Sequence, residues 1–169
     1  MELMDKLWNA AKENKQRIVL PEGDEERTIV ATEKIQKEGL AFPILIGDEE
    51  KILNKAKELD VDLTGVEIIN PNKSDRLQDY INEFYESRKN KGMTLEKADK
   101  IVRDPLYFGT MMVKLGYADG LVCGAKTSTK DSLKPALQII KVGKNSKLVS
   151  SCFIMCGKNK ALGKDSVMV

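Results

Sequence analysis

The stretch that decides the fold is residues 118–140, which read ADGLVCGAKTSTKDSLKPALQII. It opens with a short apolar run at 120–123, which is typical of a buried strand, and it breaks at Gly124. Ser128 and Thr129 then precede a segment with apolar residues at helical spacing. Those apolar residues are Leu133, Ala136, Leu137 and Ile140. The stretch therefore predicts a buried strand, a tight turn and the start of a helix.

Such a junction of strand and helix is able to bind an anion. The first backbone N–H groups of a helix have no partner within the helix and carry partial positive charge. A phosphate can bind there, and Ser128 and Thr129 would add hydroxyl donors. Lys126, Lys130 and Lys134 would add positive charge. A plain N-cap with exposed lysines is the alternative interpretation, and these residues alone leave both open.

Strands and helices alternate along the rest of the chain. Strands are expected at 17–20, 42–46 and 66–69, ahead of the one at 120–123. Helices are expected at 1–14, 25–38, 49–59, 75–91, 95–102 and 105–115. This alternation predicts an α/β fold in which a mainly parallel sheet is flanked by helices in three αβα layers.

Local signals mark three of the expected helix starts. Ser74 and Thr94 are expected to be N-caps, and Asp104 precedes a proline at the first helical position. The helix that follows Asp104 contains LYFGTMMVKLG and is almost wholly apolar. It should be a central buried helix that packs closely at Gly109.

The last part of the chain predicts a second domain. A strand is expected at 148–155, a hairpin tip at GKNKALGKD, and a returning strand from Ser166 onward. We therefore expect a first α/β domain at 1–142 and the beginning of a second one at 143–169. Because the chain stops inside an apolar strand, we expect this second domain to be truncated.

Composition excludes several classes of protein. The 169 residues are 41% hydrophobic and 32% charged, as in ordinary globular proteins. A net charge of +2 with interspersed signs argues against a nucleic-acid partner. No apolar run reaches the roughly 18 residues of a membrane span, and the N-terminus lacks the apolar core of a signal peptide. We therefore expect a cytoplasmic protein without a membrane partner.

Composition also limits the chemistry. The chain has no histidine, which excludes histidine-based catalytic triads and the commonest zinc sites, and no metal site is expected. Acid–base chemistry must use Asp, Glu, Lys, Tyr or Cys. Cys123, Cys152 and Cys156 form no CxxC pair and lie in apolar contexts, so they are expected to be small core residues.

Two strand ends carry the polar residues that a ligand site would need. In open α/β sheets, ligands bind beyond the carboxyl ends of the strands. Residues 21–24, Pro-Glu-Gly-Asp, follow the first expected strand, and residues 124–129 follow the strand at 120–123. We interpret the carboxylates at 21–24 as solvated turn residues rather than as catalytic groups.

Four segments together resemble the amino-terminal half of the phosphate acetyltransferase family: RIVLPEGDEER, YESRKNKGMT, DPLYFGTMMVKLGYADGLVCGA and STKDSLKPALQIIK. The resemblance extends from Met1 to about Met155. It implies transfer of an acetyl group between acetyl phosphate and coenzyme A, with phosphate as the other product. It also implies a two-domain α/β fold, an active site between the domains, and a homodimer in the full-length form. Coenzyme A is then a substrate, and no bound cofactor is implied.

The resemblance implies substrate-binding roles for particular residues. Arg88 stands where the family has an arginine before KGMT, and Ser128 and Thr129 match its Ser-Thr pair at the phosphate end of the cleft. Lys134 replaces the arginine of the family's L-R-P-A motif, which here reads LKPA. Gly124 belongs to the ADGLV-x-GA run and is assigned to the same site.

The chain departs from the family pattern around this site. Thr127 stands where the family usually has histidine, and Lys126 and Lys130 replace small residues. Lys134 keeps the charge of arginine but loses its planar fork. The family's serine, arginine and aspartate that hold coenzyme A and assist thiol deprotonation have no counterpart here. No catalytic residue is therefore assigned, and the isolated chain is expected to be inactive.

Two other functions remain open alongside the acetyltransferase. The first is a phosphate butyryltransferase-like enzyme on the same fold. The second is a non-catalytic module that binds phosphate or coenzyme A, which the altered LKPA motif and the missing downstream residues favour.

Overall fold

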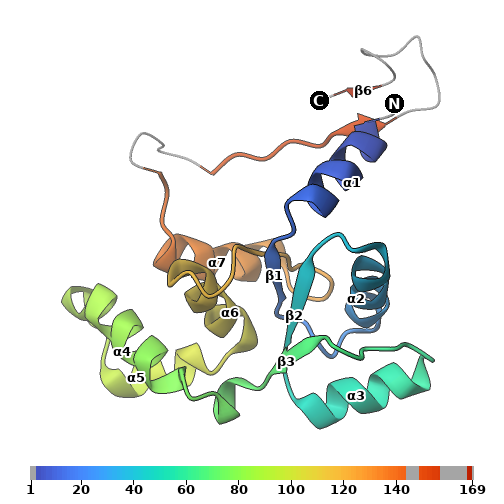
Figure 1. The fold of residues 1–169 in the computed structure, drawn as a ribbon. Helices are drawn as coiled ribbons and strands as arrows, with labels where there is room; N and C mark the ends of the chain where they lie inside the picture. The colour runs from blue at the N-terminus through green and yellow to red at the C-terminus, as the bar shows by residue number, and fades with distance from the viewer. Residues whose placement is uncertain (1–2, 144–148, 157–166, 169) are drawn as a thin grey trace. The chain divides into compact units, whose positions relative to one another are not determined.

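The computed structural model describes residues 3–143, 149–156 and 167–168 (Figure 1). The chain divides into two compact units. The larger unit is residues 15–141, and the smaller one combines residues 1–14 with 142–169. The expected domains, 1–142 and 143–169, stay a prediction.

Four parallel strands form the sheet of the larger unit, in the order β3-β2-β1-β4. They are β1 (Arg17–Leu20), β2 (Phe42–Ile46), β3 (Glu67–Ile69) and β4 (Gly120–Leu121). β4 is shorter than expected, because after Leu121 only the N–H of Val122 still bonds to β1, at the carbonyl of Val19 (2.9 Å). The backbone then turns away at Gly124, whose φ is 111°. The predicted parallel α/β sheet is confirmed.

Helices cover both faces of this sheet, as the three-layer prediction requires (Figure 1). Val19 of β1 lies in one core cluster with Phe84 and Phe108. Leu20 points to the opposite face and packs with Ile29 and Ile52. One face therefore carries α2 (Glu26–Glu38) and α3 (Glu49–Glu58), and the other carries α4 (Leu77–Arg88), α5 (Leu95–Val102), α6 (Pro105–Lys114) and α7 (Thr129–Ile139).

Two of the three expected helix starts are confirmed. Thr94 caps α5 and Asp104 caps α6, each through a side-chain oxygen that accepts backbone N–H groups of the first turn. Ser74 does not cap α4, so that prediction was wrong. A 3-10 helix, η1 (Pro71–Lys73), ends at Ser74, whose hydroxyl accepts the N–H of Arg76. The α-helix begins only after this extra turn. A second 3-10 helix, η2 (Lys89–Lys91), follows α4.

The outer face of α7 departs from its sequence pattern. Pro135 and Ile139 are the buried residues of this helix. Leu133, Leu137 and Ile140, which belong to the apolar pattern, are 38%, 47% and 43% exposed. α7 packs on α6 through the neighbouring stripe, so the apolar periodicity correctly predicts a helix but not the side that it buries.

The cysteines also differ from expectation. Cys123 is only half-buried and Cys152 is exposed. β4 ends at Leu121, so Cys123 already lies in the loop, and Cys152 lies in a segment without a strand. The side chain of Cys156 lies outside the described residues. These two cysteines are therefore not core residues.

The smaller unit contains α1 (Leu3–Glu13) and an antiparallel pair, β5 (Met155–Cys156) with β6 (Val167–Met168). The strand expected at 148–155 was wrong for residues 149–154, which carry no strand. The expected hairpin tip lies outside the described residues. Among the described residues, no helix is long and apolar enough to cross a lipid bilayer.

α6 lies against the centre of the sheet because Gly109 has no side chain. A Cβ built on Gly109 would stand 2.7 Å from the Cγ1 atom of Val19 and 3.2 Å from the Cδ1 atom of Leu121. Both distances are shorter than ordinary contact between carbon atoms. The close packing predicted at Gly109 is therefore confirmed, and it is made against β1 and β4.

We expect Gly109→Ala to lower the free energy of unfolding by about 1–3 kcal/mol, because α6 or Val19 must shift to admit the methyl group. This loss should exceed the gain of about 1 kcal/mol in helix propensity. Urea denaturation followed by circular dichroism measures it. Lys114→Ala, at an exposed position of the same helix, is the control and should change stability little. A Gly109→Ala protein as stable as the wild type would show that the close approach is not required.

Candidate functional site

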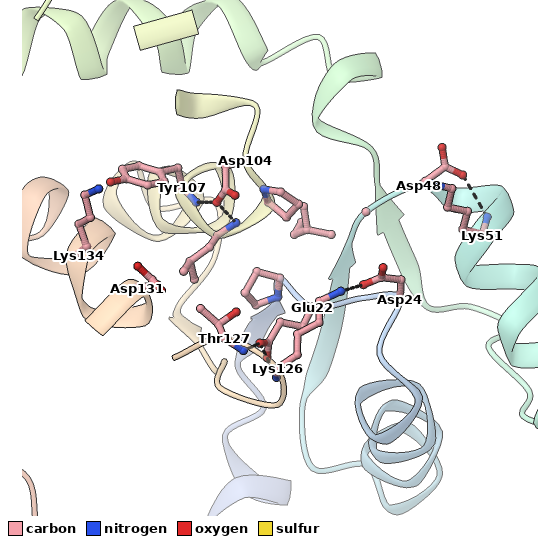
Figure 2. A pocket seen from close by; sticks show the side chains of 15 residues that line it. Glu22, Asp24, Asp48, Lys51, Asp104, Tyr107, Lys126, Thr127, Asp131 and Lys134 are labelled. Carbon is pink, nitrogen blue, oxygen red and sulfur yellow. Dashed lines mark hydrogen bonds and ion pairs between the residues drawn. The ribbon is translucent and has the colours of Figure 1, made fainter. Parts of the chain in front are cut away.

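A pocket of about 530 Å³ lies at the carboxyl end of the sheet in the larger unit (Figure 2). Its walls come from the turns after β1 and β2 and from the N-terminal parts of α3, α6 and α7. The ionisable side chains that line it include five carboxylates and three lysines: Glu22, Asp24, Asp48, Asp104, Asp131, Lys51, Lys126 and Lys134. This is the place where ligands of open α/β sheets bind.

Glu22 organises one wall of this pocket. One carboxylate oxygen accepts the backbone N–H groups of Gly124 (2.8 Å) and Ala125 (2.7 Å). The other accepts those of Lys126 (2.9 Å) and Thr127 (2.7 Å). The side chain is only 5% exposed, so the interpretation of this carboxylate as a solvated turn residue was wrong.

Strand order explains why Glu22 meets a loop 102 residues away in the sequence. Glu22 follows β1, the loop at 124–127 follows β4, and these two strands are neighbours in the sheet. Parallel neighbours end at the same edge, which places the two turns side by side. The polar residues at both strand ends were visible in the sequence, but only the strand order places the two ends side by side.

Burial and hydrogen bonding act in opposite directions on Glu22. Burial raises the pKa of its carboxyl group. Hydrogen bonds from the side chain of Thr127 and from the loop backbone outweigh burial and lower the pKa from 4.5 to about 2. Glu22 therefore stays ionised at any ordinary pH.

Two further contacts join the same two turns. Lys126 Nζ forms an ion pair with an oxygen of Asp24 at 2.5 Å, and a dashed line marks this pair in Figure 2. The guanidinium of Arg27 donates to the backbone carbonyl of Ala125 and pairs with Glu25. The turn after β1 and the first turn of α2 thus contact the loop after β4 through hydrogen bonds and an ion pair.

Ser128 is the N-cap of α7, as the sequence predicts. Its hydroxyl oxygen accepts the N–H of Asp131 at 3.2 Å and donates to the Asp131 carboxylate at 2.6 Å. Ser128 and Thr129 are both exposed at the start of the helix. The capping geometry is therefore present, and the role of this pair in binding an anion stays a prediction.

Lys134 lines the pocket one turn further along α7. Within the described residues, its ammonium group makes no hydrogen bond or ion pair, and the same holds for Lys51 on the opposite wall. Lys126, the third lysine, is paired with Asp24. Positive charge without a counter-ion thus remains at two places in the pocket.

Arg88 is not among the residues that line the pocket. It ends α4, and its guanidinium donates to the backbone carbonyl of Gln138 at 3.4 Å. The side-chain oxygen of Gln138 accepts the hydroxyl of Tyr107 at 3.0 Å, and Tyr107 lines the pocket. Within the described residues, hydrogen bonds therefore connect Arg88 to the pocket through Gln138 and Tyr107.

The sequence analysis did not identify Tyr107 as a site residue, nor the N-cap residues Asp48 of α3 and Asp104 of α6. Burial raises the pKa of Tyr107, and Asp104 raises it further while the charge of Arg88 lowers it. A phenol with a raised pKa is a hydrogen-bond donor rather than a base at neutral pH. The starts of α3 and α6 were expected from the sequence, but the sequence did not show that both lie at one pocket.

Of the five predicted site residues, four belong to one continuous segment. Gly124 donates to Glu22, Ser128 and Thr129 start α7, and Lys134 lines the pocket. Arg88 stands behind the wall. The pocket can chemically accommodate an anion near Lys134, since ammonium groups and hydroxyls attract negative charge.

Comparison with known proteins agrees with the fold. The model of the phosphate acetyl/butaryl transferase family matches residues 2–167. Proteins named phosphate acetyltransferase from Clostridium acetobutylicum and Thermoanaerobacterium thermosaccharolyticum are each 48% identical to this chain. Both matches cover 100% of this chain and 51% of the relative. The chain thus spans about half the length of the curated relatives that it matches.

Solved structures show the same resemblance in three dimensions. The EutD phosphotransacetylase from Staphylococcus aureus superimposes with a TM-score of 0.85 at 39% identity, over 94% of this chain and 49% of that one. A phosphotransacetylase from Streptococcus pyogenes also gives a TM-score of 0.85 at 39% identity, over 95% of this chain and 50% of its own.

We expect Glu22→Gln to lower the free energy of unfolding by about 3 kcal/mol at pH 7. This is the free energy that corresponds to the shift of the Glu22 pKa from 4.5 to about 2. A carboxyl group with a lowered pKa stabilises the fold above its unfolded pKa and loses this effect as the pH falls toward 2. The difference between wild type and variant should therefore shrink between pH 4.5 and 2. Urea denaturation at several pH values measures it.

Glu96→Gln is the control for this titration, because Glu96 and its partner Lys100 are both largely exposed. Its effect should be small at every pH, as for most surface ion pairs. If the effect of Glu22→Gln were the same at pH 7 and pH 2.5, the stabilisation would come from packing and not from the charge of Glu22.

Proposed function

Because this chain belongs to the phosphate acetyl/butaryl transferase family, we propose that it forms the amino-terminal part of a phosphate acetyltransferase. Such an enzyme transfers an acetyl group between acetyl phosphate and coenzyme A. The observation that carries the proposal is Lys134, which has no ion-pair partner in the described part of the chain and lines a pocket near the Ser128–Thr129 helix start. An acyl phosphate has the anionic group that these side chains suit.

The proposed reaction has a simple charge balance. The thiolate of coenzyme A attacks the acetyl carbonyl carbon, a thioester bond forms, and the bond from carbon to phosphate oxygen breaks. Inorganic phosphate leaves with the electron pair of that bond. A thiol has a pKa of about 8.5, so a base must remove its proton near neutral pH. We assign no catalytic residue of this chain to that step.

The leaving phosphate is where this chain would contribute. Negative charge accumulates on it in the transition state, and fixed donors and cations stabilise that charge. Lys134 would supply positive charge and Thr129 a hydroxyl, and Ser128 would supply its hydroxyl once this turns from Asp131 toward the phosphate. Gly124 would act through the conformation of the loop. Arg88 would support the Tyr107 wall through Gln138 rather than touch phosphate directly.

The remaining proposals follow from the resemblance. Coenzyme A is proposed as a substrate and not as a bound cofactor, and the protein is proposed to be a cytoplasmic homodimer with no nucleic-acid or membrane partner. A butyryl substrate is the second candidate, because the family description names both acyl groups. A non-catalytic phosphate- or coenzyme A-binding module is the third, which the altered LKPA motif favours.

The proposal is tested in a joined protein, in which residues 1–169 are followed by the remaining half of the Clostridium acetobutylicum relative. We expect it to form acetyl-CoA from acetyl phosphate and coenzyme A, and to form butyryl-CoA from butyryl phosphate more slowly. We expect the 169-residue chain alone to show no turnover, because the proposed base lies outside it. Thioester formation followed by absorbance measures all three.

The intact Clostridium acetobutylicum enzyme is the positive control for this assay. A folded joined protein without activity toward either acyl phosphate would contradict the transferase and favour the binding module. Turnover by the 169-residue chain alone would show that the required base lies within this half.

Lys134→Arg should raise kcat/KM for acetyl phosphate in the joined protein, by about threefold to tenfold. The guanidinium keeps the positive charge and adds a fork that can bind two phosphate oxygens at once. Lys130→Arg is the matched control, since Lys130 is exposed on the same helix and does not line the pocket. A clear fall in kcat/KM with Lys134→Arg would mean that the pocket is shaped around lysine.

A further inference from the structure

The loop at 124–127 presents four consecutive backbone N–H groups, and all four bond to Glu22. Consecutive N–H groups of this kind form a concave seat that can hold an external anion. In this protein a carboxylate of the chain itself fills the seat. A phosphate in the pocket would therefore have to bind beside this loop and not on its N–H groups.

Among the described residues, the side chains that bond to this loop come from residues 22–27. A Cβ built on Gly124 would meet no atom within 4 Å, so the loop is open to solvent there. The side-chain contacts described above come from Glu22, Asp24 and Arg27. The conformation of the loop thus depends on a polar network in which Glu22 supplies four of the hydrogen bonds.

We propose that Glu22 is a positioning residue for the acyl-phosphate site. Its carboxylate holds the loop at 124–127, and this loop leads directly into the start of α7 at Ser128 and Thr129 and so sets the position of Lys134, which lines the pocket. Glu22 also keeps the substrate phosphate off the loop N–H groups and so directs it toward Lys134. This inference rests on the proposed function, because it assigns Glu22 a role in that reaction.

The chemistry of the four hydrogen bonds requires a carboxylate. Each carboxylate oxygen of Glu22 accepts two N–H groups, so both oxygens must be acceptors. In Glu22→Gln one of them becomes an NH₂ group, which only donates and would face two N–H donors. The variant has nearly the shape of the wild type but should lose half of the contacts to the loop.

The first experiment measures kinetics in the joined protein. We expect Glu22→Gln to raise KM for acetyl phosphate about tenfold while KM for coenzyme A stays within about twofold, since a tenfold change matches the loss of about one charge-assisted hydrogen bond. Glu33→Gln is the matched control. Glu33 also accepts the backbone N–H of a loop residue, Asp62, at 2.8 Å, but it does not line the pocket.

The second experiment fills the empty seat. In Glu22→Ala the four N–H groups lose their acceptor, and formate is a carboxylate small enough to replace it. We expect Glu22→Ala to raise KM for acetyl phosphate. Sodium formate at about 50–100 mM, near the millimolar affinity of a weak ligand, should lower this raised KM part of the way toward the wild-type value. Sodium chloride at equal ionic strength should not lower this KM. Neither salt should change the KM of Glu33→Gln for acetyl phosphate.

The third experiment is independent of catalysis. Amide hydrogen exchange of residues 124–127 in the 169-residue chain should be faster in Glu22→Gln than in the wild type or in Glu33→Gln. Unchanged exchange would overturn the contact itself. Faster exchange with an unchanged KM for acetyl phosphate, or an equal rise in both KM values, would overturn the positioning role.

Failure of the proposed function gives a different result. An inactive joined protein with a wild-type amino-terminal half would overturn both the transferase and the role of Glu22 in it. The exchange data would then still show whether Glu22 holds the loop. If Glu22→Ala does not fold, Glu22→Gln and Arg27→Ala carry the kinetic test. Arg27→Ala removes the donor to Ala125, and it should raise the same KM by a smaller factor.

Discussion

The carboxylate of Glu22 joins the two strand ends from which the candidate site is built. β4 pairs with β1 at only two positions, Ile18↔Gly120 and Val19↔Leu121, so its backbone hydrogen bonds hold it weakly. Side chains reinforce the pair at both ends. The guanidinium of Arg17 lies 2.8 Å from Asp119 where the strands begin, and Glu22 binds the loop where they finish. These side-chain contacts thus fix the position of the short edge strand β4 and of the loop at 124–127 that follows it.

The hydrophobic core and the site share β1 as their common reference. Val19 meets α6 at Gly109, which sets the distance between this helix and the sheet. The N-terminal end of the same helix brings Asp104 and Tyr107 to the pocket. The next residues of β1 lead directly to Glu22. A change in the packing of α6 would therefore move one wall of the pocket relative to the other.

Electrostatics in the pocket depend on which charges already have partners. The carboxylates outnumber the lysines, but hydrogen bonds or ion pairs engage each of them within the described residues: Glu22, Asp24, Asp48, Asp104 and Asp131. The lysines without such partners, Lys51 and Lys134, are the charges available to a ligand. The proposed anion site therefore depends on a position close to these two lysines, because the carboxylates keep their negative charge.

Local sequence determined the elements and the family of this protein. The strands at 17–20 and 42–46 lie where the pattern placed them, and the helix expected at 25–38 ends at Glu38, because strand patterning and helix ends depend on a few neighbouring residues. The motif around Ser128 also correctly marked the start of α7. Tertiary structure decided which side of α7 is buried, how far β4 extends, and that Glu22 meets the loop at 124–127. Those outcomes depend on strand order and on contacts between residues far apart in the chain, and hydrophobic periodicity carries no information about either.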